Sequence, residues 1–148
     1  MLIEACESTE HPGWLRLRQA LWPECPREQH FSEMSSFVAD PQRHGQFLAY
    51  SASREAVGLV EASVRHEHVN GTESSPVAFL EGLYVVPQAR RKGVAASLVA
   101  RVCEWARGAG CRELASEAVL ENSIAPVVHR ALGFEQTERV VFFRRKLA

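Results

Sequence analysis

Residues 80–95 read LEGLYVVPQARRKGVA, and this stretch decides the fold class of the chain. Apolar and aromatic residues dominate its first half and predict a central strand over 77–86, which Pro87 ends. Gly82 within that strand predicts a bulge or the close approach of another segment. From Val94 onward, apolar residues recur every three or four positions, which predicts a helix with one buried face. A strand that leads through a short loop into a helix indicates a sheet with helices packed on it.

A basic turn joins the strand to the helix. Arg90, Arg91 and Lys92 stand directly before Gly93. The first amides of a helix have no partner within it, and the helix dipole favours an anion beside them. Gly93 and Ala95 add no bulk, so a ligand can approach the backbone closely. The segment therefore predicts a diphosphate-binding turn, although taken alone it also fits an ordinary solvated turn.

The rest of the chain predicts a mixed α/β arrangement around one sheet, in one domain that covers residues 1–148. A polar connection at 53–55 joins two strand patterns into a hairpin. Asn122 or Ser123 caps the last predicted helix, and Gly133 is placed to end it. The predicted strands are 2–6, 46–52, 56–65, 77–86, 112–117 and 138–147, and the predicted helices are 14–21, 28–38, 94–107 and 122–132.

Composition restricts the class of protein. The chain has 148 residues, 46% hydrophobic and 24% charged, which is typical of a globular domain with a core. A net charge of -1 argues against a nucleic-acid or membrane partner. The first residues lack the pattern of a signal peptide, and no apolar run approaches the ~20 residues of a membrane span, so we expect a cytoplasmic protein. Four cysteines without CxxC spacing predict free thiols.

The motif Arg90-x-x-Gly93-x-Ala95 resembles the signature Q/R-x-x-G-x-G/A of the GNAT acetyltransferases, in its usual place between a strand and a helix. Residues 131–134, ALGF, resemble the second signature of that family. Asn122 resembles an asparagine that contacts the pantetheine arm in many members. The resemblance implies the α/β (α+β) fold of the acyl-CoA N-acyltransferases, a mixed, mostly antiparallel sheet flanked by helices, and acetyl-CoA as cosubstrate without a metal.

The resemblance also implies where acetyl-CoA binds. Its pantetheine arm would pair like an added strand with Leu83, Tyr84 and Val85, and an N–H near Val85 would polarise the thioester carbonyl. Its pyrophosphate would lie on the turn, beside Arg90, Arg91, Lys92, Gly93, Val94, Ala95 and Ala96.

A narrower resemblance, to the aminoglycoside 6′-N-acetyltransferases, covers nearly the whole chain. It implies a polycationic aminoglycoside as substrate, with Glu81, Glu117 and Glu138 reaching it from three strands, Trp22 as a wall and His68 against a sugar ring. Homodimers are frequent among similar enzymes. Position 117 holds glutamate where these enzymes tend to have aspartate, and position 68 holds histidine in place of tyrosine, which bears on the range of drugs. The similar segments are 14–23, 63–71, 74–77, 79–82, 110–113, 115–117, 121–122, 128–129, 131–135 and 137–140.

The implied reaction needs a base, because an alkylamine with a pKa of about 10 is almost fully protonated at neutral pH. Glu81 is the candidate, either directly or through ordered water. Many GNAT enzymes protonate the leaving thiolate with a tyrosine at the position of His129. Either His129 takes that role or the thiolate leaves without a dedicated acid, since a thiol with a pKa of about 8.5 is a fair leaving group.

Three alternatives remain open on the sequence alone. Other GNAT enzymes acetylate a protein N-terminus, a lysine or a polyamine, and they share every feature of the wider family. A non-catalytic acyl-CoA-binding module is a second possibility, which Glu81 on the central strand argues against. His66-Glu67-His68 offers two metal ligands, but no third ligand with metal spacing follows.

Overall fold

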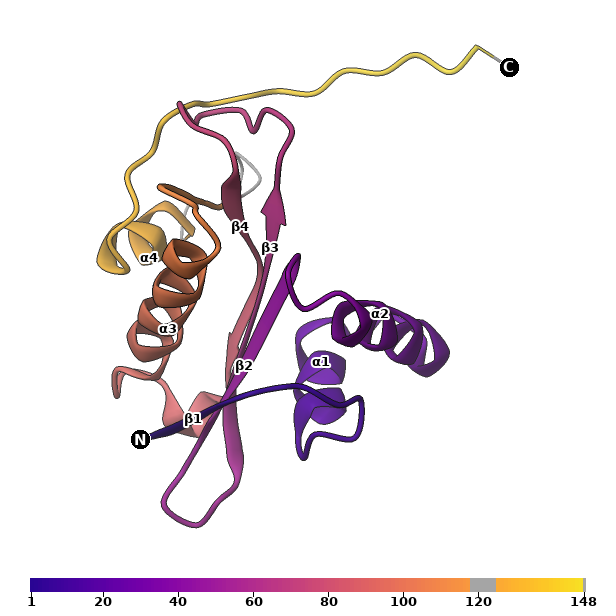
Figure 1. The fold of residues 1–148 in the computed structure, drawn as a ribbon, viewed down its shortest axis with the longest axis vertical. Coiled ribbons are helices and arrows are strands. Elements are labelled where there is room, and N and C mark those ends of the chain that lie inside the picture. Colours follow the sequence, from indigo (N-terminus) through magenta and orange to yellow (C-terminus); the bar gives the residue numbers. More distant parts are fainter. Residues whose placement is uncertain (118–124, 148) are drawn as a thin grey trace.

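One mixed sheet of five strands, in the order β1-β2-β3-β4-β5, organises the structure (Figure 1). This computed structural model describes residues 1–117 and 125–147. Strands β1 to β4 pair antiparallel with their neighbours, whereas β5 runs parallel to β4, so the predicted mixed, mostly antiparallel sheet is confirmed. The strands are β1 (Leu2–Ala5), β2 (His44–Tyr50), β3 (Ala56–Arg65), β4 (Val77–Val85) and β5 (Leu114–Ala115).

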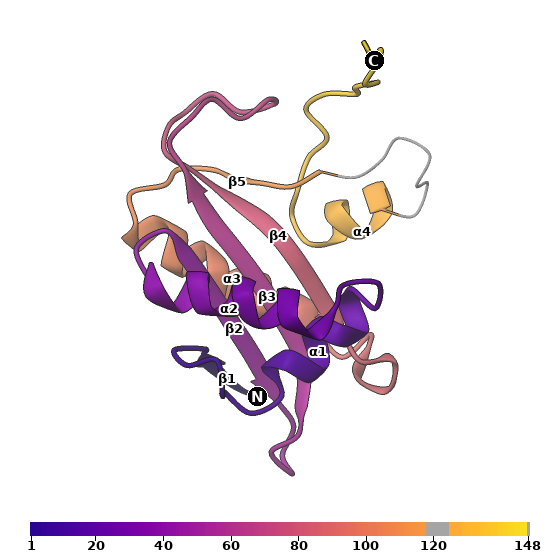
Figure 2. The same ribbon diagram turned by 90° about the vertical axis from the view of Figure 1, so that its right-hand side faces the viewer.

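Helices cover both faces of the sheet. In Figures 1 and 2, α1 and α2 lie on one side of it, and α3 and α4 lie on the other. The predicted helices at 14–21 and 28–38 are confirmed to within one residue at each end. Within the described residues, no helix combines the length and apolarity needed to cross a bilayer. The helices are α1 (Trp14–Leu21), α2 (Arg27–Ala39), the short 3₁₀ helix η1 (Pro87–Ala89), α3 (Val94–Gly108) and α4 (Ala125–Ala131).

The core lies between the sheet and its helices. Val94, Leu98 and Val102 form the buried face of α3, as predicted, and this face packs on β2 and β3. On the opposite side, Trp14 and Leu17 of α1 are fully buried against β3. Each large apolar side chain buried in this way contributes about 1.5–3 kcal/mol. Both helix layers are therefore fixed to the sheet by apolar packing.

A bulge interrupts the pairing of β3 with β4. Glu61 lies opposite Gly82 and Ala62 lies opposite Leu80, which leaves Glu81 as the extra residue of β4. A Cβ atom on Gly82 would lie 2.6 Å from the Trp22 ring, so only glycine allows that ring to approach. The predicted bulge and the predicted close approach at Gly82 are both confirmed.

The other edge of β4 is paired over only two residues. Ala78 lies opposite Leu114 and Phe79 lies opposite Ala115. The predicted strand 112–117 is thus shorter than expected. Figure 2 shows β5 crossing away from β4 after this contact. Beyond Phe79, no strand in the described part of the chain pairs with that edge of β4, and its backbone groups are open to a ligand.

The predicted C-terminal strand is wrong for this structure. Residues 135–147 form neither strand nor helix, and Figure 1 shows them running away from the body of the molecule. Phe142 and Phe143 are 83% and 92% exposed. Their residue types favour strands, but a strand also needs a neighbour for its hydrogen bonds, and this segment has none among the described residues. The predicted end of the preceding helix is confirmed, because Gly133 has a φ of +91°.

Candidate active site

The turn between β4 and α3 separates its three basic side chains. Arg90 folds back on the strand, where its Nε donates to the Val85 carbonyl at 2.8 Å and its guanidinium lies 5.8 Å from the centre of the Tyr84 ring. Arg91 and Lys92 are exposed to solvent. Arg90 therefore shapes the turn, and the other two side chains supply positive charge that a ligand can reach.

The backbone at the start of α3 has the geometry that an anion site requires. Gly93 is the N-cap residue with a φ of +82°, and no side chain caps the helix. The Ser97 N–H bonds to the Gly93 carbonyl at 3.0 Å, so the amides of Val94, Ala95 and Ala96 precede the first bond of the helix. A Cβ on Gly93 would point into open space, which leaves room for a diphosphate over these amides.

Leu83, Tyr84 and Val85 form the strand that leads into this turn. Their edge facing away from β3 is the one left open beyond the short pairing with β5. An extended ligand can pair with such an edge as an additional strand would. The open edge and the amides of α3 together match the two ends of a nucleotide thioester, namely its pantetheine arm and its diphosphate.

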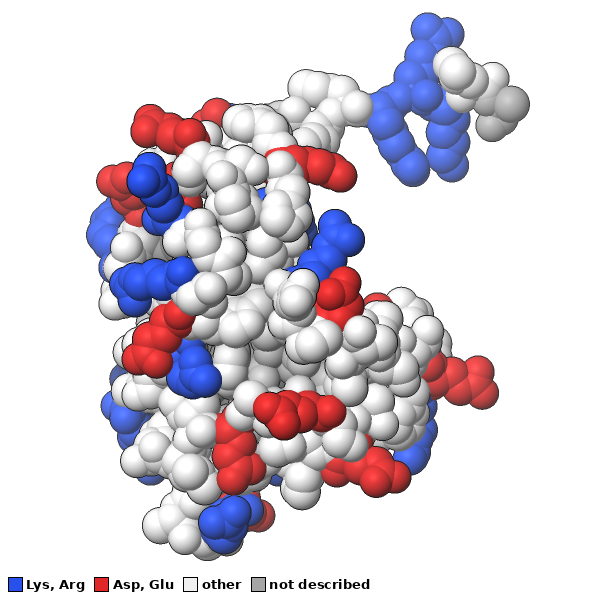
Figure 3. All heavy atoms as spheres, in the orientation of Figure 1, with Lys and Arg blue, Asp and Glu red and all other residues white. Residues whose placement is uncertain are grey.

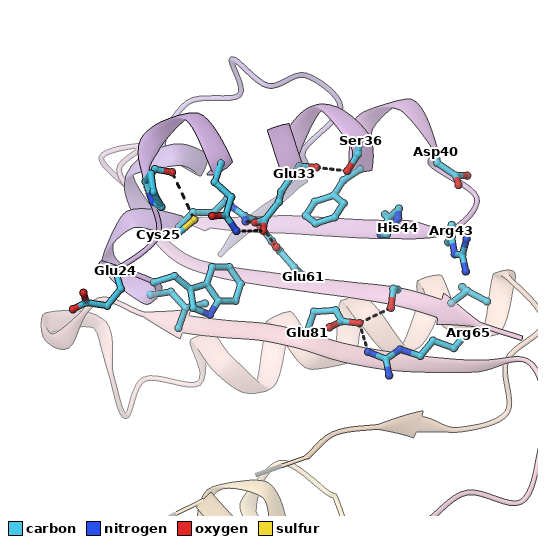
Figure 4. Close-up of a pocket in the computed structure, with 18 of the residues that line it drawn as sticks. Glu24, Cys25, Glu33, Ser36, Asp40, Arg43, His44, Glu61, Arg65 and Glu81 are labelled. Atoms are coloured by element: carbon cyan, nitrogen blue, oxygen red, sulfur yellow. Dashed lines mark hydrogen bonds and ion pairs between the residues drawn. The ribbon is translucent and has the colours of Figure 1, made fainter. Parts of the chain in front are cut away.

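A cleft of about 1110 Å³ lies between the α1–α2 side and the strands β3 and β4. Figure 4 shows Glu33 and Asp40 on its helical wall and Glu61 and Glu81 on its strand wall. Five carboxylates and three arginines line the cleft, which leaves a negative excess. Burial lowers the pKa of His44, another lining residue, which favours its neutral ring. The charged lining residues are Arg18, Glu24, Glu33, Asp40, Arg43, Glu61, Arg65 and Glu81.

Glu81 lies at the bulge of β4, on the face of the strand that lines the cleft. The Ser63 hydroxyl donates to its Oε1 at 2.7 Å, and the Arg65 guanidinium pairs with the same oxygen at 2.8 Å. The Arg65 guanidinium also lies 3.7 Å from the centre of the Phe79 ring. The side chains of Glu81 and Arg65 are 37% and 42% exposed, so this ion pair is held in place yet accessible.

A second carboxylate, Glu61 of β3, is buried below the cleft. Arg18 donates to its Oε1 at 2.5 Å, and the Trp14 indole donates to its Oε2 at 2.8 Å. Burial raises the pKa of Glu61, while the charge of Arg18 and these two hydrogen bonds oppose that shift. Sequence reasoning missed this pair. The signals were Glu61 in the middle of an otherwise apolar stretch of strand, and Arg18 on the apolar face of α1.

The structure brings together only part of the predicted substrate site. Trp22 and Glu81 line the same cleft. His68, Glu117 and Glu138 are exposed and do not line it, and Glu138 lies on the segment that leaves the body. The predicted convergence of three glutamates from three strands is therefore not found here, because the segment that carries Glu138 has no strand to pair with.

Two further predicted residues lie near the end of the chain. The Nε2 atom of His129 lies 2.7 Å from the Ser116 hydroxyl oxygen, and the His129 ring packs edge-on against the Phe134 ring. Asn122 lies outside the described residues.

Among the described residues, the potential metal ligands that lie close together are Cys25, His30 and Glu33. In the part of the chain that the structure describes, His66 and His68 do not belong to such a group. The ligand atoms of Cys25, His30 and Glu33 lie within 4.8 Å of one another. Arg18 donates to His30 Nδ1 at 3.1 Å, and its positive charge beside the group disfavours a metal cation there. We therefore assign this group to the protein's own polar network.

Comparison with known proteins identifies the family. The model of the acetyltransferase (GNAT) family matches residues 14–134. An aminoglycoside N(6′)-acetyltransferase type 1 from Acinetobacter genomosp. 13 is 50% identical over 134 residues, which is 90% of either chain.

Solved structures agree with this match. The apo aminoglycoside 6′-N-acetyltransferase AAC(6′)-IG from Acinetobacter haemolyticus is 44% identical and superposes with a TM-score of 0.90 over the full length of both chains. AAC(6′)-Iy in complex with the bisubstrate analogue CoA-S-monomethyl-acetylneamine is 40% identical, with a TM-score of 0.88 over 99% of each chain. The open strand edge, the anion-binding turn and the acidic cleft thus occur in a chain that belongs to the GNAT acetyltransferase family, within the group of the aminoglycoside N(6′)-acetyltransferases.

Proposed function

We propose that this chain transfers the acetyl group of acetyl-CoA to the 6′-amine of an aminoglycoside antibiotic and so confers resistance to it. The observation that carries the proposal is the acidic cleft that Glu81 lines. Glu81 lies on the same strand as the open edge at 83–85. An aminoglycoside has several ammonium groups, and a cleft with a negative excess attracts it. Relatives that share 40–50% of the residues carry this activity.

The cosubstrate site follows from the turn and the open strand. The pyrophosphate of acetyl-CoA binds the amides of 91–96, with Arg91 and Lys92 beside it. The pantetheine arm pairs with Leu83, Tyr84 and Val85, and Asn122 is a further candidate for contact with that arm. Residues 83–96 lie on one continuous stretch of chain from β4 into α3, which supports a fixed path for the cosubstrate.

Glu81 acts as the base for the substrate amine. An ammonium has no lone pair, so Glu81 accepts its proton, directly or through water, before the nitrogen attacks the thioester carbon. The Val85 N–H stabilises the oxyanion of the tetrahedral intermediate, which then expels coenzyme A as a thiolate. The contact of His129 with Ser116 favours a structural part for that ring over the role of acid.

Trp22 and Glu81 form the substrate site that the cleft supports directly. We retain His68, Glu117 and Glu138 as further candidates for contacts with sugar rings and ammonium groups. The site draws on residues from both halves of the chain, which supports one catalytic domain over residues 1–148.

The first alternative function is acetylation of a protein N-terminus, a lysine or a polyamine. The second alternative is that the chain is a non-catalytic acyl-CoA-binding module. To test them, the protein is incubated with acetyl-CoA and, in parallel, tobramycin, spermidine or a basic peptide. We expect tobramycin to gain one acetyl group, located on the 6′-nitrogen by NMR. Acetylation of spermidine or the peptide without any of tobramycin would reject the proposal, and binding of acetyl-CoA without turnover of any substrate would favour the module.

Replacement of Glu81 tests the base. We expect Glu81→Gln to lower kcat about 100-fold, since general-base catalysis contributes that much or more. The dissociation constant of acetyl-CoA, measured by calorimetry, should not change. The matched control is Glu55→Gln, which removes the same charge from the exposed β2–β3 hairpin. A kcat for Glu81→Gln equal to that of the control would exclude the assigned role.

Replacement of Gly93 tests the diphosphate site. A methyl group at this position would project into the open space where the diphosphate is proposed to lie, so we expect Gly93→Ala to raise the KM for acetyl-CoA about tenfold, the loss of roughly one charge-assisted hydrogen bond. The control is Gly110→Ala, because Gly110 has the same left-handed backbone, with a φ of +85°, and open space around it. Both variants carry similar backbone strain. An equal KM for acetyl-CoA in the two variants would count against a diphosphate on this turn.

We also infer that the enzyme is a homodimer in the cytoplasm. Free cysteines at all four positions suit a reducing compartment. The segment 138–147 is rich in strand-forming residues and has unpaired backbone groups, which favours pairing with a second copy. Figure 3 shows basic side chains gathered at its end, clear of the body.

Light scattering measures the assembly. The unmodified protein should have a mass in solution twice that of the 16.5 kDa chain. The double variant Val141→Glu with Phe143→Glu should have the mass of the monomer. Two charges on this segment oppose its burial between copies. A monomeric full chain at micromolar concentration would exclude the dimer, and cell fractionation checks the compartment.

A further inference from the structure

Arg18 is buried below the cleft and contacts polar side chains of two other elements. Its side chain is only 2% exposed, and all its polar partners lie on other elements. On β3 it pairs with Glu61 at 2.5 Å; on α2 it donates to His30 Nδ1 at 3.1 Å and pairs with Glu33. The forked guanidinium suits this task, because its five donors point in fixed directions within one plane.

The charges of this network are not balanced evenly. Arg18 brings one positive charge and the two carboxylates bring two negative ones. Glu61 is 4% exposed and is already held on both oxygens by Arg18 and Trp14. The carboxylate of this network that a ligand can reach is therefore Glu33, whose side chain is 39% exposed and lines the cleft.

Arg18 also holds two aromatic walls of the same cleft. Its guanidinium carbon lies 4.9 Å from the centre of the Trp22 ring and 5.5 Å from that of the Phe37 ring. Both rings line the cleft. A guanidinium stacked on an aromatic face is attracted to it and limits its movement. One buried side chain thus orients a carboxylate and two rings toward the substrate space.

Glu33 has support on its solvent side as well. Gln29 Nε2 donates to its Oε1 at 3.3 Å, one helical turn earlier on α2, while Arg18 holds its Oε2. Figure 4 places Glu33 on the helical wall of the cleft and Glu81 on the strand wall. The cleft therefore presents one carboxylate on each wall.

We propose that Arg18 is a positioning residue that holds Glu33 as the docking carboxylate for a second ammonium group of the polycationic substrate. This inference rests on the proposed function, in which Glu81 receives the amine that is acetylated. Glu33 does not take part in the chemistry. It sets the orientation of the substrate across the cleft, and its loss weakens binding without slowing acetyl transfer.

The first experiment compares Glu33→Gln with Glu28→Gln, a control that removes the same charge from an exposed part of α2 outside the cleft. We expect Glu33→Gln to raise the KM for tobramycin about tenfold, as for the loss of one hydrogen bond between charged groups. Its kcat and its KM for acetyl-CoA should stay within about twofold of the wild type on the same reasoning. Equal tobramycin KM values in the two variants would overturn the docking role.

A substrate with one amine isolates the second ammonium group. For 6-amino-6-deoxyglucose, the kcat/KM of Glu33→Gln should equal that of the wild type, because this sugar has no second ammonium to dock. A loss with this sugar as large as that with tobramycin would place Glu33 at the reacting amine and overturn the proposal. Absence of tobramycin acetylation by the wild type would instead reject the proposed function itself.

Two variants test the positioning role of Arg18 separately from its contribution to folding. Arg18→Lys keeps the charge but cannot hold two carboxylates and stack on two rings, so we expect the tobramycin KM to rise as in Glu33→Gln. Arg18→Met with Glu61→Gln removes the buried pair as a unit, which avoids leaving one buried charge alone. We expect this double variant to keep a cooperative thermal transition and the wild-type KM for acetyl-CoA, with a raised KM for tobramycin. If the double variant keeps the wild-type KM for tobramycin, Arg18 has a structural role only and the positioning role is rejected.

Discussion

Strand β4 carries one residue more than the stretch of β3 opposite it, and the sheet takes up the extra residue at Glu81. This bulge places the consecutive residues Glu81 and Gly82 on the face of β4 that carries the cleft, and Gly82 leaves room for the Trp22 ring. The strand-side carboxylate and an aromatic wall of the cleft therefore meet at the same irregularity. The next residues, 83–85, belong to the open edge that leads to the anion-binding turn, so the two substrate sites share one strand.

The two glutamates of the strand wall have different partners and different environments. Glu61 is buried and bound to Arg18, and removal of either partner would leave an isolated charge in the core. Glu81 is partly exposed and bound to Arg65, which makes its ion pair weak and easily rearranged. The first pair fixes α1 and α2 against the sheet and so maintains the cleft. The second pair contains Glu81, the base of the proposed mechanism.

Much of the fold could be predicted from the sequence, because local patterns determine it. The helical spacing after Gly13, the bulge at Gly82 and the glycine that begins α3 all depend on near neighbours along the chain. The basic turn was also predicted, although the folding of Arg90 back onto Val85 needed the structure.

The missing parts depend on distant contacts. Arg18 and Glu61 are 43 residues apart, and no local pattern links them. Glu33 resembled any exposed residue of a helix until its wall of the cleft was known. The predicted strand at 138–147 rested on residue types alone, and strand formation requires a partner that the described chain does not supply. The roles expected for Glu117 and Glu138 came from resemblance, and the structure does not place either residue in the cleft.

The ion pair between Arg65 and Glu81 has a consequence for selectivity. In the proposed mechanism Glu81 receives the reacting amine, and in the free protein this carboxylate already has a cation beside it. Binding at Glu81 is therefore an exchange of one cation for another, with little net electrostatic gain. A molecule with a single positive charge gains almost nothing by this exchange, whereas one with several charges gains from the carboxylates that remain. Under the proposed mechanism, the cleft therefore favours molecules with several positive charges over monoamines.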